Sequence, residues 1–114
     1  MQILMTDTAR HLVHPRVADA VIELAVLVLR RGDTAAVTVP CYRRGQPSTV
    51  RVLLHAGTQL VVEPDDSPDR DLDPYSLALL REITARGESI AGGVTPRSEP
   101  TLEECFIDFD RFDQ

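Results

Sequence analysis

The most regular pattern in the chain is a helical repeat of apolar residues between Pro15 and Gly32. Apolar side chains recur every three or four residues, and charged residues form the opposite stripe. Proline suits the first turn of a helix, and glycine is common just beyond the last one. The pattern therefore predicts a helix, with Arg30 and Arg31 at the end that favours positive charge.

Short segments on both sides of this helix have the period of β-strands. Residues 2–5 and 11–13 precede the helix and are separated by a turn, which predicts a hairpin. Three further segments follow it and are connected by short polar turns. Short connections favour an antiparallel meander, because parallel crossovers need a dozen or more residues. The three segments are 34–42, 48–55 and 59–63.

The last third of the chain predicts a second helix and a C-terminal extension. Asp73-Pro74 suits the cap and first position of a helix, and Arg86-Gly87 suits its end. Residues 89–94 predict a short strand, and a capping box at 101–104 opens a terminal helix. The complete pattern predicts an α+β fold of ββαβββα order. It consists of an antiparallel sheet packed by two helices and a short C-terminal strand or helix extension.

Size and composition are those of one soluble domain. The chain has 114 residues, 43% of them apolar, which is enough for one core. We therefore expect residues 1–114 to form a single domain. No apolar run approaches the ~20 residues that span a bilayer, and the N-terminus does not resemble a signal peptide. These features favour a cytoplasmic protein that does not enter a membrane.

The basic residues are all arginine, which excludes several kinds of chemistry. The chain has 12 Arg and no Lys, Asn or Trp. Without a lysine amine it cannot form a Schiff base, carry a nucleotidyl group on lysine or use a P-loop lysine. Lys and Asn both have A-rich codons, so their loss suggests a high-GC genome such as that of an actinobacterium or its phage.

Charge is divided unevenly along the chain. Residues 1–57 hold seven Arg and four acidic residues, a net charge of +3, whereas residues 58–114 hold five Arg and fourteen acidic residues, a net charge of −9. This acidity argues against a broad nucleic-acid surface. A local basic patch is the exception, because guanidinium groups bind phosphate and carboxylate well. The candidate anion- or nucleic-acid-binding residues are Arg43, Arg44 and Arg51, and a solubilising turn is the alternative.

An acidic segment copies part of a calcium-binding loop. Asp69, Asp71 and Asp73 have the spacing of the first three ligands of an EF-hand. Pro74 stands where the loop requires glycine, and Leu80 stands where it requires a bidentate acid. We therefore interpret the segment as a solvated loop with a helix cap, and we expect no metal there.

Two other groups of residues resemble chemical sites but are incomplete. Asp7, His11 and His14 would share a face only in a helix, which the proline after His14 disfavours. Cys41 and His55 fall on neighbouring predicted strands, with no third group to orient them. We therefore expect no catalytic residues, no metal and no cofactor. A small enzyme or metal-binding protein is the alternative.

Two apolar segments exceed what one core requires. All six residues from Leu24 to Leu29 are apolar, so a second face of the helix is covered either within the monomer or by a partner. All three Phe of the chain lie in the last nine residues and are interspersed with Asp. This tail, within residues 101–114, either docks on the core or binds a partner groove. The candidate partner-binding residues are Leu27, Phe106, Phe109 and Phe112.

Four short motifs resemble segments of other small proteins. They are Val13-His14-Pro15-Arg16, Leu29-Arg30-Arg31-Gly32-Asp33, Leu53-Leu54-His55 and Gly92-Gly93-Val94. Together they resemble a family of short stand-alone actinobacterial proteins of unknown function, which implies a hairpin, a helix and strands but no catalytic residues. Residues 94–106 also resemble the C-terminus of certain drug-export ABC ATPases, although the ATPase motifs are missing.

These observations favour a non-enzymatic protein-interaction or regulatory module. Its expected partner is another protein or a second copy of the chain, which would form a homodimer. A nucleic-acid-associated accessory protein that uses the arginine-bearing hairpin is the first alternative. A small enzyme or metal-binding protein is the second.

Overall fold

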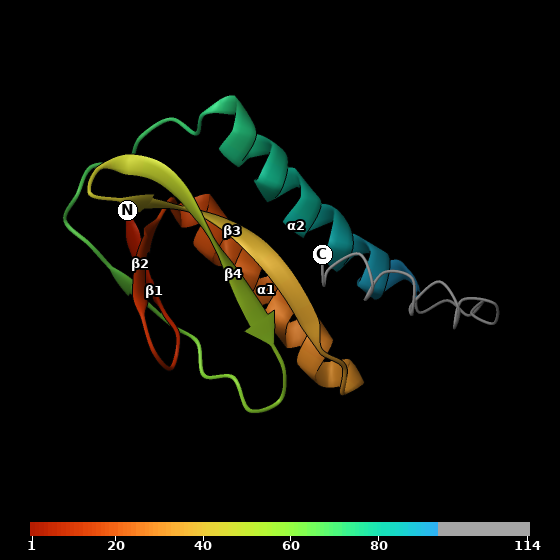
Figure 1. Ribbon diagram of the computed structural model, residues 1–114. Helices are drawn as coiled ribbons and strands as arrows, with labels where there is room; N and C mark the ends of the chain where they lie inside the picture. Colours follow the sequence, from red (N-terminus) through yellow and green to blue (C-terminus); the bar gives the residue numbers. More distant parts are fainter. Residues whose placement is uncertain (94–114) are drawn as a thin grey trace.

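Residues 1–93 form a five-stranded antiparallel sheet and two helices in the computed structural model (Figure 1), and these are the residues that the structure describes. The predicted α+β class and the ββαβββα order are confirmed. The predicted terminal helix and the tail at 101–114 lie outside the described residues. The elements are β1 (Gln2–Met5), β2 (Arg10–Val13), α1 (Pro15–Arg31), β3 (Ala35–Arg43), β4 (Gln46–Leu54), β5 (Val61–Pro64) and α2 (Pro74–Gly93).

Helix α1 begins and ends where its sequence signals predict. The Nδ1 atom of His14 accepts a hydrogen bond of 3.1 Å from the amide of Arg16, so a histidine caps the N-terminus. At the other end, Gly32 has a φ of 68° and its N–H bonds the carbonyl of Leu29 at 3.0 Å. Glycine adopts this left-handed conformation without a steric penalty.

Strands β3 and β4 form a long hairpin whose turn is tighter than the sequence predicts. Arg44 and Gly45 alone make the turn, with φ values of 55° and 79°. Positive φ at both positions is typical of a type I′ turn, whose twist matches that of the strands. Gln46 and Pro47 were expected in the turn but belong to β4, where Pro47 lies opposite Tyr42.

The predicted meander is wrong at its last strand. The strand order is β4-β3-β2-β1-β5, so β5 pairs with β1 and not with β4. Met5 lies opposite Val61, and the ladder continues past β5 with the amide of Asp65 bonded to the carbonyl of Met1. The β1–β2 turn and β4 line one cleft, so the six residues 55–60 are long enough to reach β1. Loop length alone could not show which strand is nearest.

Helix α2 begins as predicted but is longer than predicted. Asp73 caps it by accepting hydrogen bonds from the amide and the hydroxyl of Ser76, at 3.2 and 2.7 Å. The sequence signals placed its end at Gly87 and a strand beyond, whereas the helix continues to Gly93. Packing overrides the local signal, because Ile90 lies against the core beyond the glycine.

The core lies between α1, the inner face of the β3–β4 hairpin and α2. Figure 1 shows α1 running along the hairpin, with α2 beside it. The residues that fill this core are almost all aliphatic, and they include Leu4 and Val13 from the first hairpin. Neither helix of residues 1–93 contains an apolar stretch of the length that spans a bilayer. The other core members are Val17, Ala18, Val21, Leu24, Ala25, Val28, Ala35, Val37, Val39, Cys41, Val52, Leu54, Leu80 and Ile83.

Candidate functional site

One stripe of α1 keeps apolar side chains outside the core. Ile22, Val26 and Leu29 are spaced by four and three residues, so they lie on one line along the helix. Val26 is 42% exposed and Leu29 is 40% exposed, while Ile22 is half-buried. Contiguous exposed apolar side chains are candidates for an interaction surface, whereas single exposed apolar residues are normal.

A shallow apolar groove of about 210 Å³ runs beside this stripe. The end of β4 and the loop after it form the opposite wall, through Leu54, His55 and Leu60. Thr58 holds the loop in place, because its hydroxyl donates to the carbonyl of Leu53 and accepts from the amide of His55, both at 3.0 Å. The stripe Ile22, Val26 and Leu29 together with this groove is called the α1 face below.

Charged residues border the α1 face on the side away from the groove. Glu23 and Arg30 are both exposed and are separated by seven residues. Seven residues are almost two helical turns, so the two side chains lie on the same flank of α1. One end of this flank is therefore negative and the other is positive.

The apolar run in α1 is only partly covered within the monomer. Leu24, Ala25 and Val28 are buried in the core. Leu27, the predicted partner-binding residue, is half-buried and faces α2, where its Cδ1 atom lies next to Gly87. The side chains left for a partner are therefore those of the α1 face, which the apolar run alone did not single out.

The β3–β4 turn carries more arginine than the sequence indicated. Arg70 donates a hydrogen bond of 2.7 Å to the carbonyl of Gly45, and its guanidinium lies 5.1 Å from the centre of the Tyr42 ring. Burial, helped by the negative charge of Asp73, raises the pKa of Tyr42. The acidic loop before α2 is thus tied to the tip of the hairpin.

The three predicted anion-binding arginines do not form one patch. Arg43 and Arg44 lie at the turn, but Arg51 lies five residues beyond Gln46 on β4. At ~3.4 Å per residue this separation is about 17 Å. A phosphate at the turn would therefore meet Arg43 and Arg44 without Arg51.

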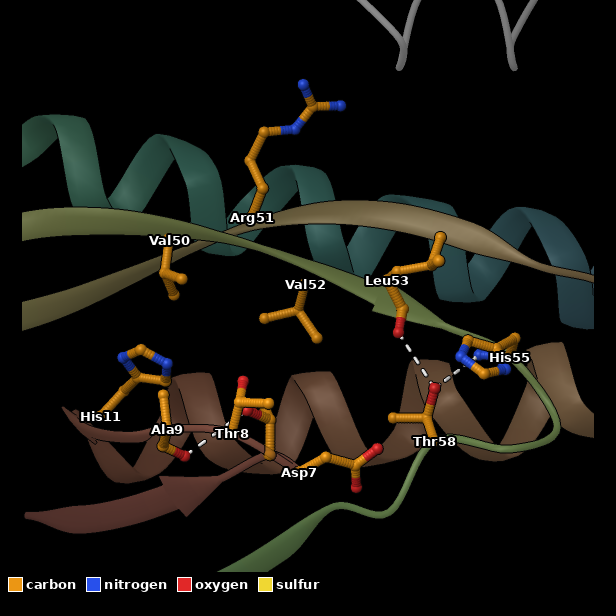
Figure 2. A pocket seen from close by; sticks show the side chains of 11 residues that line it. Asp7, Thr8, Ala9, His11, Val50, Arg51, Val52, Leu53, His55 and Thr58 are labelled. Carbon is orange, nitrogen blue, oxygen red and sulfur yellow. Dashed lines mark hydrogen bonds between the residues drawn. The ribbon is translucent and has the colours of Figure 1, made fainter.

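A polar cleft of about 320 Å³ separates β4 from the β1–β2 turn (Figure 2). Val50 and Val52 point into the cleft from β4, and His11 lies across from them. Burial and, to a smaller extent, the nearby charge of Arg43 lower the pKa of His11. This histidine is therefore more readily neutral than an exposed one. The turn residues Thr6 to Ala9 complete the wall.

The two incomplete groups that resemble chemical sites in the sequence are not assembled into a site in residues 1–93. Cys41 lies opposite Ser48 in the hairpin, seven residues from His55, which is about 24 Å along a strand. Burial raises the pKa of the Cys41 thiol, which disfavours a nucleophilic thiolate. His11 and Asp7 share the cleft, but His14 caps α1 instead. Residues 1–93 contain no group of three or more His, Cys, Asp or Glu that could hold a metal ion.

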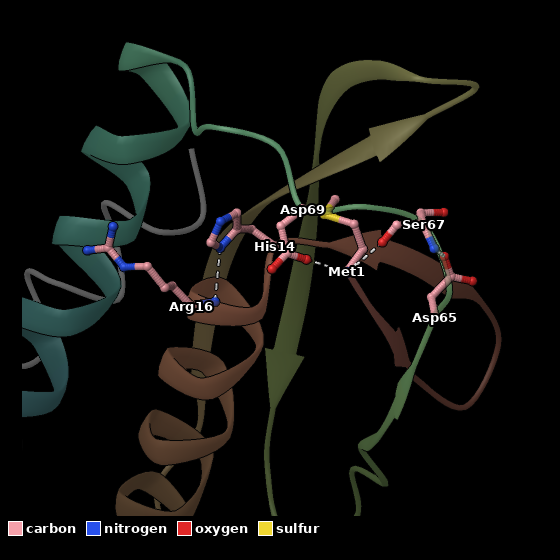
Figure 3. Close-up of polar contacts among 6 residues, drawn as sticks. All are labelled: Met1, His14, Arg16, Asp65, Ser67 and Asp69. Carbon is pink, nitrogen blue, oxygen red and sulfur yellow. Dashed lines mark hydrogen bonds and ion pairs between the residues drawn. The ribbon is translucent and has the colours of Figure 1, made fainter.

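The carboxylates of the acidic loop before α2 accept hydrogen bonds from neighbouring groups (Figure 3). Hydrogen bonds from Ser67 lower the pKa of Asp65, and a hydrogen bond from the N-terminal amine of Met1 lowers the pKa of Asp69. The same amine donates to the carbonyl of Ser67 at 2.9 Å. The interpretation of this segment as a solvated loop with a helix cap agrees with these contacts.

Two further results bear on the site. The predicted partner-binding residues Phe106, Phe109 and Phe112 lie outside the described residues. Comparisons with protein-family models, with curated proteins and with solved structures find no match. The family resemblance therefore stays an expectation from the sequence, and function must be argued from the surfaces of this chain.

Proposed function

We propose that this protein is a non-enzymatic interaction module that works as a homodimer, with the α1 face of one copy packed against that of another. The observation that carries the proposal is the exposed stripe of Ile22, Val26 and Leu29 beside an apolar groove. Removing apolar surface from water contributes roughly 25 cal/mol per Å². When two such stripes pack together, apolar surface of both copies is buried, and both contribute to the free energy of dimerisation.

The flanking charges favour a second copy as the occupant. A two-fold axis perpendicular to the helices makes the two copies of α1 run antiparallel, and the same flank of each then faces that of its partner. Glu23 lies three residues before Val26, and Arg30 lies four residues after it. Pairing centred near Val26 therefore places Glu23 of each copy beside Arg30 of the other. The surface is self-complementary in charge as well as in hydrophobicity.

Light scattering after size exclusion, from about 1 to 200 μM protein, tests this proposal with a charge-reversal cycle. We expect the wild type to dimerise, and we expect Glu23→Arg and Arg30→Glu each to weaken the dimer. An exposed ion pair contributes about 0.2–1 kcal/mol. Either single variant turns both symmetric Glu23–Arg30 pairs of the dimer into like-charge pairs, so the dimer Kd should rise roughly 5- to 30-fold.

The double variant Glu23→Arg plus Arg30→Glu restores opposite charges and should dimerise like the wild type. Glu82→Arg makes the same charge change at an exposed position of α2 and serves as the matched control. A wild type that stays monomeric at 200 μM contradicts the proposal. So does a dimer that none of the charge variants affects.

A further inference from the structure

The β3–β4 turn determines which backbone groups of β4 point away from the sheet. A two-residue turn makes its flanking residues, Arg43 and Gln46, a hydrogen-bonded pair. Pairs then alternate along the ladder, so Gln46, Val50 and the other even-numbered residues bond β3. The backbone groups of the odd-numbered residues, which include Thr49 and Leu53, point to the outer edge.

Independent contacts agree with this assignment. The carbonyl of Leu53, which should point outward, accepts the hydroxyl of Thr58. On the other side of the hairpin, the carbonyl of Ala36 points away from β4 and accepts a hydrogen bond of 2.8 Å from Arg86. Pro47 falls in a pair that makes no ladder bond, so its missing N–H disturbs nothing.

Strand β4 is the long outer edge of the sheet. It has nine residues and stands last in the strand order, whereas the opposite edge strand, β5, has four. No other strand of residues 1–93 pairs along the outer side of β4. A long outer edge is a template for a further strand. Proteins either protect such an edge from pairing or bind another strand along it.

The surroundings of this edge differ between its two faces. On the inner face, Val50 and Val52 point into the polar cleft of about 320 Å³ (Figure 2). On the outer face, Thr49 and Arg51 are exposed, and Leu53 is 57% exposed. A strand added here would place alternate side chains in the cleft and the others beside Arg51.

We propose that β4 accepts an added strand, and that the occupant is the segment Ile107-Asp108-Phe109-Asp110 of the same chain. Apolar and acidic residues alternate in this segment. Ile107 and Phe109 can therefore lie beside Val50 and Val52, with Asp108 and Asp110 on the face of Arg51. This inference does not depend on the homodimer proposed above.

Reach and charge both support this occupant. Fourteen residue steps separate Gly93 from Ile107, which span up to about 45 Å when extended, close to the largest dimension of the molecule, 46 Å. Residues 101–114 hold five acidic residues and one Arg, and the outer face of the β4 edge carries Arg51. A second copy of β4, paired antiparallel about Arg51, would set Arg51 against itself. Like charges directly opposite each other are unfavourable.

Amide hydrogen exchange of the full chain, followed residue by residue by NMR, tests the proposal. The outward amides of Thr49 and Leu53 should exchange as slowly as those of Val50 and Val52, which bond β3. In an antiparallel added strand, the residues on the face of Arg51 are the ones whose N–H groups bond β4. Asp110→Pro therefore removes an N–H from the added ladder and should accelerate exchange at Thr49 at least tenfold, with no change at Val50 and Val52. Asp110→Ala, which makes the same charge change but keeps the N–H, is the matched control and should stay close to the wild type.

Charge variants and dilution provide the second part of the test. Arg51→Glu should accelerate exchange at Thr49, and adding Asp108→Arg should restore slow exchange. The result should be the same in a Glu23→Arg background, so failure of the homodimer leaves this test intact. Fast exchange at Thr49 and Leu53 in the wild type overturns the proposal. Protection that disappears on dilution also overturns it, because the strand would then come from another copy.

Discussion

Replacing Gly87 by alanine tests the packing of α2 against α1. Gly87 is an interior residue of α2, and its backbone does not adopt positive φ. A Cβ atom added there would lie 3.7 Å from the Cδ1 atom of Leu27, which is an ordinary van der Waals distance. The site therefore accepts alanine without movement of its neighbours.

The expected effect of Gly87→Ala is a gain in stability of about 1 kcal/mol. Alanine is favoured over glycine in a helix interior by ~0.8–1.0 kcal/mol, mainly because glycine loses more backbone freedom on folding. The new methyl group also fills space in the groove of about 220 Å³ between α1 and α2. For a domain of this size, 1 kcal/mol corresponds to a rise in Tm of roughly 4 °C.

Urea unfolding followed by circular dichroism measures the effect, with Gly32→Ala as the matched control. Gly32 has open space around its Cα but a φ of 68°, so alanine there should destabilise the protein by about 1 kcal/mol. The two substitutions therefore add the same methyl group with opposite results. If Gly87→Ala destabilises the protein, Gly87 ends the helix as its sequence suggested, and the described course of α2 is wrong.

Two further outcomes follow from groups with shifted pKa values. Hydrogen bonds from Ser76 hold the pKa of Asp73 below its ordinary value of 3.8, so its ionised form stabilises α2 at higher pH. The stability lost in Asp73→Ala should therefore be full at pH 6 and shrink as the pH falls below about 4; a pH-independent difference in urea unfolding would exclude this role. In a Cys105→Ser variant, the buried Cys41 thiol should react with a disulfide reagent at pH 8 at least 100-fold more slowly than in 6 M guanidinium, and equal rates would show that the thiol is accessible.

Local signals predicted the elements whose ends are set by nearby residues. Helix α1 has proline at its start, glycine at its end and one apolar period between them, and each of these acts within a few residues. The β3–β4 hairpin is also local, since Gly45 supplies a conformation that the turn needs. These signals do not depend on the rest of the fold, so the sequence alone reveals them.

Features set by distant residues could not be predicted in this way. The pairing of β5 with β1 depends on how the sheet curls, and the extension of α2 beyond Gly87 depends on contacts of Ile90 with the core. The α1 face is another such feature. The six apolar residues from Leu24 to Leu29 point in all directions around the helix, and only the position of α2 determines that Leu27 is covered while Val26 and Leu29 are not.

The uneven charge of the chain acquires a physical interpretation from the two proposed contacts. The net charge of −9 in residues 58–114 disfavours nucleic-acid binding by that half of the chain. Residues 1–57 have a net charge of +3, which the fold of the first half does not by itself explain. If the acidic segment lies along β4, the carboxylates of Asp108 and Asp110 are placed beside Arg51, within the same molecule. The attraction is between exposed groups, so salt should weaken it. Exchange at Thr49 should therefore accelerate between 0.05 and 1 M salt, whereas amides in the β3–β4 ladder should not change.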